Sequence, residues 1–157
     1  MLARRTGRKQ ESRLSAPIPV LDAEEVQAYL GEVFPQIQAD PDAAFSVVGV
    51  EPGLVVMRLM AGERHLRPGG TVSGPTLFTL ADVAAYACTL AHVGRYALAV
   101  TTNLNINFMR KAPPGPLEAR ARLLKLGRQL AVFEIEMSAG DEIVAHATST
   151  YSIPKRG

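Results

Sequence analysis

The hydrophobic residues of this chain change their spacing twice, and the longest apolar stretch lies in the middle. From Leu77 onward, apolar residues recur at spacings of three and four, which is the period of a core-facing helix. Ser73 is a good N-cap type, and Pro75 fits a first helical turn because its missing N–H is not needed there. Gly94 is a natural stop. The pattern predicts a long helix from near Pro75 to the residue before Gly94.

A second, more polar face shares this predicted helix. Thr79, Asp82 and Tyr86 lie one turn apart, so the carboxylate would have a hydroxyl before it and a phenol after it. Asp82 is the only acid between Glu63 and Glu118. Burying a carboxylate is costly, which favours a catalytic role. The alternative is a hydrogen-bonded acid at a subunit interface.

The same helix is apolar enough for a membrane span to be considered. The run from Thr76 to Val93 is short for spanning, and Asp82 near its middle would cost about 2.5–3.5 kcal/mol on insertion scales. A soluble helix surrounded by its neighbours is the better interpretation. Its many alanines predict close packing, as in a sheet that wraps around the helix.

Strand patterns flank the long helix on both sides. Phe45 to Glu51 and Leu54 to Met60 enclose Pro52-Gly53, which is a hairpin signal. Beyond the helix, polar and apolar residues alternate with a strict period of two from Thr101 to Phe108. The predicted polar face comprises Thr101, Asn103, Asn105 and Asn107. The proline-rich segment from Lys111 to Pro116 predicts a corner outside the sheet.

The remaining segments complete the expected fold. Leu117 to Leu126, Leu130 to Met137 and Ile143 to Tyr151 predict a meander of three strands with tight turns. Near the start, Leu21 to Ile37 predicts a first helix, which Asp22 and Glu25 begin as a capping box and Pro35 kinks or ends early. The order of elements favours an α+β architecture, with one antiparallel sheet around the long helix. Such a sheet keeps a free edge that a second subunit can cover.

Composition and charge indicate the number of domains, the nature of the N-terminal segment and the cellular compartment. The 157 residues are 47% hydrophobic and 20% charged, which suits one globular domain, assigned to residues 19–157. Residues 1–18 carry much of the positive charge without apolar periodicity, and we expect a solvated, disordered tail rather than an RNA- or membrane-binding arm. No apolar signal-peptide region follows these charges. The single cysteine, Cys88, lies on the apolar stripe, which indicates core packing and a reducing compartment, the cytoplasm.

These features together resemble the hotdog-fold acyl-CoA thioesterases of the phenylacetate-degradation (PaaI-like) type. The resemblance covers roughly Phe45 to Ile153. In that family the loop and helix usually read Asn, several residues, His-Gly-Gly, four residues and Leu-Ala-Asp. The stretch SGPTLFTLAD aligns with this motif without a gap. Its counterparts of the histidine, the two glycines and the acid are Ser73, Gly74, Pro75 and Asp82.

The resemblance implies three catalytic residues. The Gly74 N–H at the helix start would polarise the thioester carbonyl, and Asp82 would act as general base or nucleophile. Thr101 stands near a Ser/Thr that in relatives approaches from the other subunit, and it would orient the attacking water. Substrate-binding residues are expected among Arg67, Ser73, Pro75, Thr79, Tyr86 and Asn103.

The departures from the family motif affect the expected chemistry. Arg67 replaces the usual asparagine, and it would either bind a CoA phosphate or pair with Asp82 and weaken it as a base. Pro75 has no N–H and cannot donate to an oxyanion. Arg110, Lys111 and Arg128 are further candidates to meet the CoA diphosphate, although loop cations are usually only solvated.

The sequence therefore predicts a cytoplasmic homodimer, or homotetramer, that hydrolyses an acyl-CoA thioester between subunits. No cofactor is expected besides the CoA of the substrate, and no nucleic-acid or membrane partner. No metal is expected either, because His65, His92 and His146 lack ligand-like spacing. The alternative is a non-catalytic acyl-CoA or acyl-carrier binding protein on the same fold. A hotdog dehydratase is disfavoured because its catalytic histidine is missing.

Overall fold

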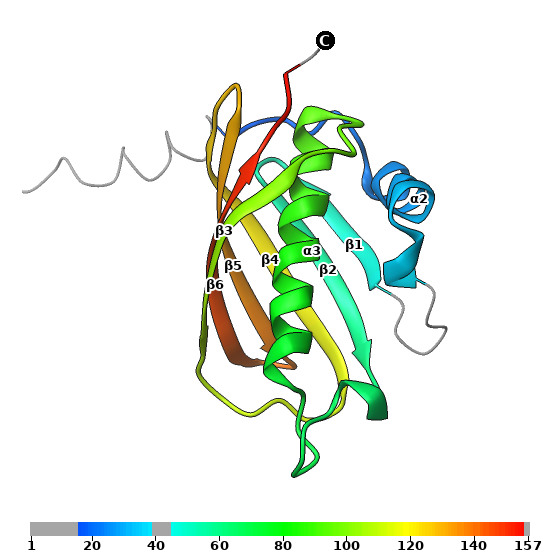
Figure 1. Ribbon diagram of the computed structural model, residues 1–157, viewed down its shortest axis with the longest axis vertical. Coiled ribbons are helices and arrows are strands. Elements are labelled where there is room, and N and C mark those ends of the chain that lie inside the picture. Colours follow the sequence, from blue (N-terminus) through cyan, green and yellow to red (C-terminus); the bar gives the residue numbers. More distant parts are fainter. Residues whose placement is uncertain (1–15, 39–44, 156–157) are drawn as a thin grey trace, which may run out of the picture.

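Six antiparallel strands form one sheet that curves around a long helix (Figure 1). The computed structural model describes residues 16–38 and 45–155, so residues 1–15 of the predicted tail lie outside the described residues. The strands are β1 (Phe45–Glu51), β2 (Leu54–Ala61), β3 (Val100–Phe108), β4 (Gly115–Leu126), β5 (Leu130–Ala139) and β6 (Glu142–Ser152). The helices are α2 (Ala23–Val33) and α3 (Gly74–Val93), with 3-10 turns η1 (Pro35–Gln38) and η2 (Glu63–His65). The strand order is β1-β2-β4-β5-β6-β3, and the predicted hotdog architecture is confirmed.

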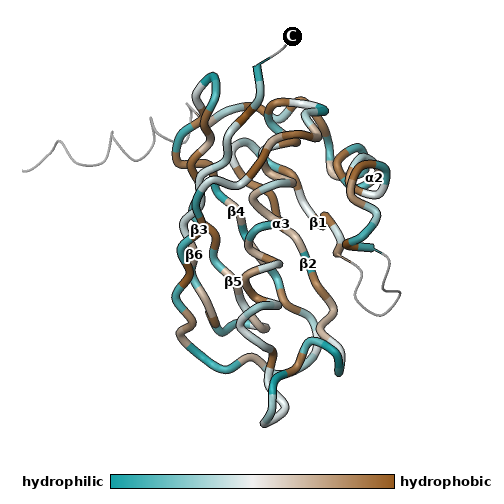
Figure 2. The backbone as a smooth tube through the Cα atoms, viewed as in Figure 1, coloured by the Kyte–Doolittle hydropathy of each residue, from teal (hydrophilic) through white to brown (hydrophobic). Residues whose placement is uncertain are grey.

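The helix α3 begins and ends where its sequence signals predict. The Ser73 hydroxyl accepts a hydrogen bond from the Thr76 N–H at 3.3 Å, and Pro75 follows in the first turn. Gly94 closes the helix with a φ of 99°, a conformation that glycine adopts without a Cβ clash. By length and hydropathy α3 also passes as a membrane span, but 67% of its apolar window is buried inside the protein. In Figure 2 this apolar helix lies along the sheet.

The first helix begins and ends early as its sequence signals predict. The capping box of Asp22 and Glu25 is present, with both hydrogen bonds at 2.9 Å. The helix α2 ends at Val33, and a 3-10 turn starts at Pro35, because proline cannot donate the next helical hydrogen bond. The Gln27 side chain bonds the backbone of β1 at two points, Phe45 O and Val47 N, so α2 covers this edge of the sheet.

The strict alternation predicted for the strand after α3 is wrong at its beginning. The β3–β6 register shifts between Thr101 and Asn103, so the intervening residue forms a bulge. Thr101 consequently faces α3, together with the partly buried Leu104 and Ile106, whereas Asn103 is exposed. The proline-rich corner is also shorter than predicted, because β4 already starts at Gly115.

Two buried groups on α3 stabilise the fold. Cys88 is fully buried and burial raises the pKa of its thiol, which keeps it protonated, so its predicted role in the core is confirmed. His92 accepts a hydrogen bond at Nε2 from the Gly53 N–H (2.9 Å), in the turn between β1 and β2. Its Nδ1 lies 2.8 Å from the Cys88 carbonyl oxygen. Burial lowers the pKa of His92 and so favours the neutral imidazole that this hydrogen bond requires.

Candidate functional site

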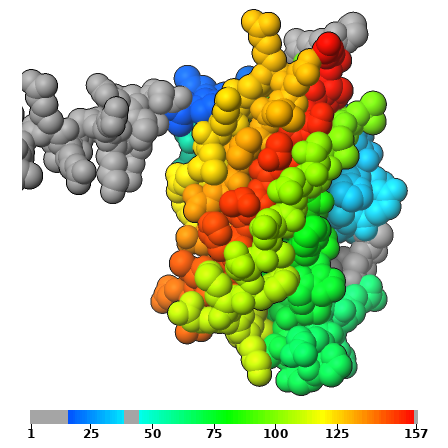
Figure 3. Space-filling model, turned by 60° about the vertical axis from the view of Figure 1, so that its left-hand side comes forward, coloured from blue at the N-terminus to red at the C-terminus, as the bar shows by residue number. Residues whose placement is uncertain are grey.

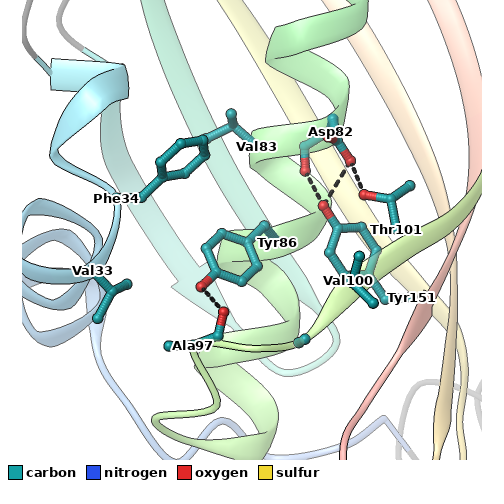
Figure 4. Close-up of a pocket in the computed structure, with 10 residues that line it drawn as sticks. Val33, Phe34, Asp82, Val83, Tyr86, Ala97, Val100, Thr101 and Tyr151 are labelled. Atoms are coloured by element: carbon teal, nitrogen blue, oxygen red, sulfur yellow. Dashed lines mark hydrogen bonds between the residues drawn. The ribbon is translucent and has the colours of Figure 1, made fainter.

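The only acid of α3, Asp82, lies half-buried in the middle of the helix and is held by two hydroxyl groups. Thr101 on β3 donates a hydrogen bond to Asp82 Oδ1 at 2.6 Å. Tyr151 on β6 places its hydroxyl 2.7 Å from the same oxygen and 2.8 Å from the Asp82 carbonyl oxygen (Figure 4). Thr101 and Tyr151 are direct partners in the β3–β6 register, so both reach α3 from the same point of the sheet.

The bulge in β3 makes this arrangement possible. Without the register shift, Thr101 would share a face with Asn103, as the sequence predicts, and would turn away from α3. Instead it contacts the carboxylate of its own chain.

A hollow of about 290 Å³ opens beside Asp82. Its polar groups are Asp82, Thr101 and the phenols of Tyr86 and Tyr151, and its remaining walls are mainly apolar. Phe34, just after α2, contributes one wall and meets the Tyr86 ring edge-on at 6.4 Å between ring centroids (Figure 4). The segment before the region of family resemblance thus forms part of this hollow. The other lining residues are Val33, Val83, Ala97, Ala99 and Val100.

The phenol beside Asp82 is not the one that helical spacing predicts. Tyr86 lines the hollow, but its hydroxyl donates to the Ala97 carbonyl oxygen at 2.8 Å. Thr79 is exposed, and its hydroxyl donates to the Pro75 carbonyl oxygen at 2.9 Å. The partner of the carboxylate is Tyr151, which the sequence analysis missed. A signal existed, because the alternation of β6 places this phenol on the buried face, where a hydroxyl needs a hydrogen-bond partner.

A second hollow, of about 350 Å³, lies at the start of α3. Arg67, Arg110 and Lys111 supply three exposed cations to its lining, and Gly74 forms part of its wall. Phe108, from the end of β3, lies against Gly74. A Cβ on that glycine would lie 3.3 Å from the Phe108 ring, which is tighter than an ordinary contact.

The backbone N–H of Gly74 is available at this helix start. The Thr76 N–H donates to the Ser73 hydroxyl, the Leu77 N–H donates to the Ser73 carbonyl oxygen, and Pro75 has no N–H. Within residues 16–38 and 45–155, the Gly74 N–H is therefore the first-turn donor without a hydrogen-bond acceptor. It points a partial positive charge out of the helix N-terminus, where the dipole favours an anion.

The two hollows are separated along α3. Asp82 follows Gly74 by eight positions along the helix, which at a rise of about 1.5 Å per residue corresponds to roughly 12 Å. One thioester carbonyl cannot contact both groups of the same chain. Arg67 also lines the hollow distant from Asp82, so a pairing of these two side chains within one subunit does not occur.

The other residues that the sequence singled out as candidates lie outside the hollow beside Asp82. Ser73 is the N-cap of α3, Pro75 is exposed in the first turn, and the exposed Asn103 has no side-chain hydrogen bond within the described ranges. His65 accepts a hydrogen bond from the Gly62 N–H at Nδ1, and its carbonyl oxygen accepts one from the Ser73 N–H. In the part of the chain that the structure describes, no three His, Cys, Asp or Glu side chains group as metal ligands.

Comparisons with known proteins agree with the hotdog fold and indicate a family for the chain. A family profile described as Thioesterase superfamily matches residues 69–146. A candidate esterase of Pseudomonas aeruginosa is 33% identical over 102 residues, which are 64% of this chain and 75% of that protein. The crystal structure of a candidate thioesterase from Silicibacter sp. TM1040 is 53% identical, with a TM-score of 0.79 over 90% of this chain and 97% of that one.

The PaaI proteins are also among the structural neighbours. A mutant of the phenylacetic acid degradation protein PaaI from Thermus thermophilus superposes with a TM-score of 0.67 at 26% identity. The aligned region covers 76% of this chain and 99% of the PaaI chain. Together with the matching profile and the closely similar Silicibacter structure, these likenesses confirm the resemblance found in the sequence. The chain belongs to the thioesterase superfamily and is a PaaI-like hotdog protein.

Proposed function

We propose that this protein hydrolyses acyl-CoA thioesters to the free acid and CoA, with Asp82 as the catalytic carboxylate. The observation that carries the proposal is the position of Asp82. It is held by two hydroxyl donors beside a hollow whose remaining walls are mainly apolar, in a chain of the thioesterase superfamily. A carboxylate in such a place can activate water or attack an electrophilic carbonyl carbon.

The proposed reaction has two alternative first steps. As a general base, Asp82 takes a proton from water while the resulting hydroxide attacks the thioester carbon. As a nucleophile, the carboxylate attacks the carbon itself, and water then hydrolyses the acid anhydride. In both cases negative charge develops on the carbonyl oxygen, the carbon–sulfur bond breaks, and the CoA thiolate leaves and is protonated. A preorganised N–H donor stabilises the developing oxyanion most effectively.

A site shared between two copies of the chain would supply that donor. The Gly74 N–H and Asp82 of one chain are too far apart, but the Gly74 of a second, antiparallel helix can lie opposite Asp82. The free edge of the sheet supports such a dimer. Gln27 covers β1, whereas Val100 and Phe108 on β3 are 57% and 53% exposed. Figure 3 shows β3 crossing the surface between β6 and α3.

The second hollow, at the start of α3, supports CoA as the carrier of the acyl group. Arg67, Arg110 and Lys111 surround the helix start, and CoA carries a diphosphate and a 3′-phosphate that such side chains bind. Arg110 donates to the Ile143 carbonyl oxygen at 2.9 Å, which orients it on the rim. In a dimer this hollow would lie next to the partner's acid, so the carrier and the reacting carbonyl would occupy adjacent places.

The first test is release of free thiol from a panel of acyl-CoAs by the purified protein and by Asp82→Asn. We expect turnover by the wild type and a loss of roughly 10²–10⁴-fold in kcat for the variant, because the amide cannot accept a proton or attack. Thermal unfolding with each acyl-CoA serves as the control for binding. Stabilisation by ligand without thiol release from the wild type would refute the hydrolase and indicate a non-catalytic acyl-CoA binding protein.

A further inference from the structure

We propose that Tyr151 is a positioning residue for the hydrolysis, and that Asp82 reacts through Oδ2 and not through Oδ1. The inference rests on the proposed function and specifies the working atom of its site. Both hydroxyl donors converge on one carboxylate oxygen, because Tyr151 lies 2.7 Å and Thr101 2.6 Å from Oδ1. Among the described residues, Oδ2 has no hydrogen-bond donor, and Asp82 lines the hollow.

The Tyr151 side chain is held rigidly by its neighbours. Only 3% of it is exposed, its ring stacks on Tyr86 at 6.2 Å between centroids, and it meets Phe133 edge-on at 6.0 Å. The hydroxyl also lies 2.8 Å from the Asp82 carbonyl oxygen, so it spans the main chain and side chain of the same residue. A fixed donor at these two atoms restricts the rotation of the carboxylate.

The Tyr151 phenol is suited to act as a permanent hydrogen-bond donor. A phenol carries one proton, which it gives to an acceptor, and two oxygens of Asp82 lie within hydrogen-bond distance of it. Burial raises the pKa of the Tyr151 phenol, and the negative charge of Asp82 raises it further. The phenol therefore remains protonated at the pH at which the enzyme works, and it does not itself transfer a proton in the reaction.

This arrangement divides the two oxygens of Asp82 by role. Oδ1 receives two short hydrogen bonds and serves as the anchor. Oδ2 keeps its lone pairs for the water proton or the thioester carbon, in line with the reaction that the proposed function describes. Reaction geometries are sensitive to displacements of about 1 Å, so releasing the anchor should lower the chemical step more than substrate binding.

The test compares Tyr151→Phe with Ser149→Ala in thiol-release kinetics and thermal unfolding. Tyr151→Phe removes the hydroxyl but keeps the ring. Ser149→Ala removes another buried hydroxyl of β6, one that donates to the Asn103 carbonyl oxygen and does not contact Asp82. We expect Tyr151→Phe to lower kcat roughly 10- to 100-fold with KM within about twofold. Ser149→Ala should retain wild-type kcat even where it lowers Tm.

Thr101 gives a second measurement that does not depend on Tyr151. Thr101→Ser keeps the donor and should retain most of kcat, whereas Thr101→Val should lower it while KM stays the same. If Tyr151→Phe lowers Tm but leaves kcat at the wild-type value, the hydroxyl is only structural and the inference is wrong, although the hydrolase stands. If the wild type releases no thiol from any acyl-CoA, the proposed function fails and this role fails with it.

Discussion

The two hollows along α3 differ in the charge and the hydrogen bonding of their polar groups. The hollow beside Asp82 has a carboxylate and three hydroxyl groups among apolar side chains, and these hydroxyls are hydrogen-bonded to the carboxylate or to the backbone. The hollow at the helix start is lined by three exposed cations and by Gly74, whose N–H has no acceptor among the residues that the structure describes. The first hollow suits the proposed chemistry at a carbonyl group, and the second suits the proposed binding of an anionic carrier.

The difference indicates why one chain is not enough for the proposed reaction. The carboxylate and the oxyanion donor are roughly 12 Å apart on the same helix, although a single carbonyl group needs both. Two antiparallel copies of α3 would bring opposite hollows together. The free edge at β3, and the covered edge at β1, make this the expected mode of association.

In the hollow at the helix start, the largest effect is expected at Gly74, where two variants separate the N–H from the side chain. Both Gly74→Pro and Gly74→Ala add a Cβ that lies 3.3 Å from the Phe108 ring, but only proline removes the N–H. We expect proline to lower kcat by roughly 10²–10³-fold relative to alanine, the usual effect of losing one oxyanion donor. Steady-state thiol release measures the ratio. Equal kcat values for the two variants would exclude this N–H as the donor.

A smaller effect is expected from the cations of the second hollow. Arg67→Ala and Lys111→Ala should each raise KM for acyl-CoA roughly fivefold, since an exposed charge pair contributes up to about 1 kcal/mol. The same variants should leave KM unchanged for an acyl thioester of N-acetylcysteamine, which has no phosphate. Lys125→Ala, an exposed cation of β4 outside both hollows, is the control. A rise in KM for both substrates would mean that these cations do not bind phosphate.

The fold was largely readable from the sequence, and the site only in part. The cap at Ser73, the stop at Gly94 and the turn at Pro52-Gly53 are local signals, and each appears where it was predicted. The bulge after Thr101 has no such signal, because a single extra residue in a strand depends on how its partner strand packs. The contact of Tyr151 with Asp82 joins residues 69 positions apart, which helical spacing cannot reveal.

The smallest effect is on the stability of the protein at alkaline pH, and it arises from Tyr151 beside Asp82. An unfolded tyrosine titrates near pH 10, whereas burial and the Asp82 charge raise the pKa of Tyr151 in the folded protein. The unfolded chain therefore loses its proton first, and the free energy of unfolding should fall by up to about 1.4 kcal/mol per pH unit above pH ~10. Urea unfolding between pH ~8 and ~11 measures this slope. Tyr151→Phe should remove the contribution of this phenol and leave those of the Cys88 thiol and the Tyr86 phenol, whose pKa values burial also raises. An unchanged slope would contradict the assignment.

Complementation between two inactive variants tests most directly whether the site combines Asp82 of one chain with the Gly74 N–H of another. Asp82→Asn and Gly74→Pro are co-expressed with different tags, and thiol release is compared with that of each variant alone. Random pairing makes about half of the dimers mixed, and each mixed dimer holds one intact site, so we expect about one quarter of the wild-type activity. Activity no higher than the average of the two separate variants, in a sample shown to contain mixed dimers, would contradict the shared site.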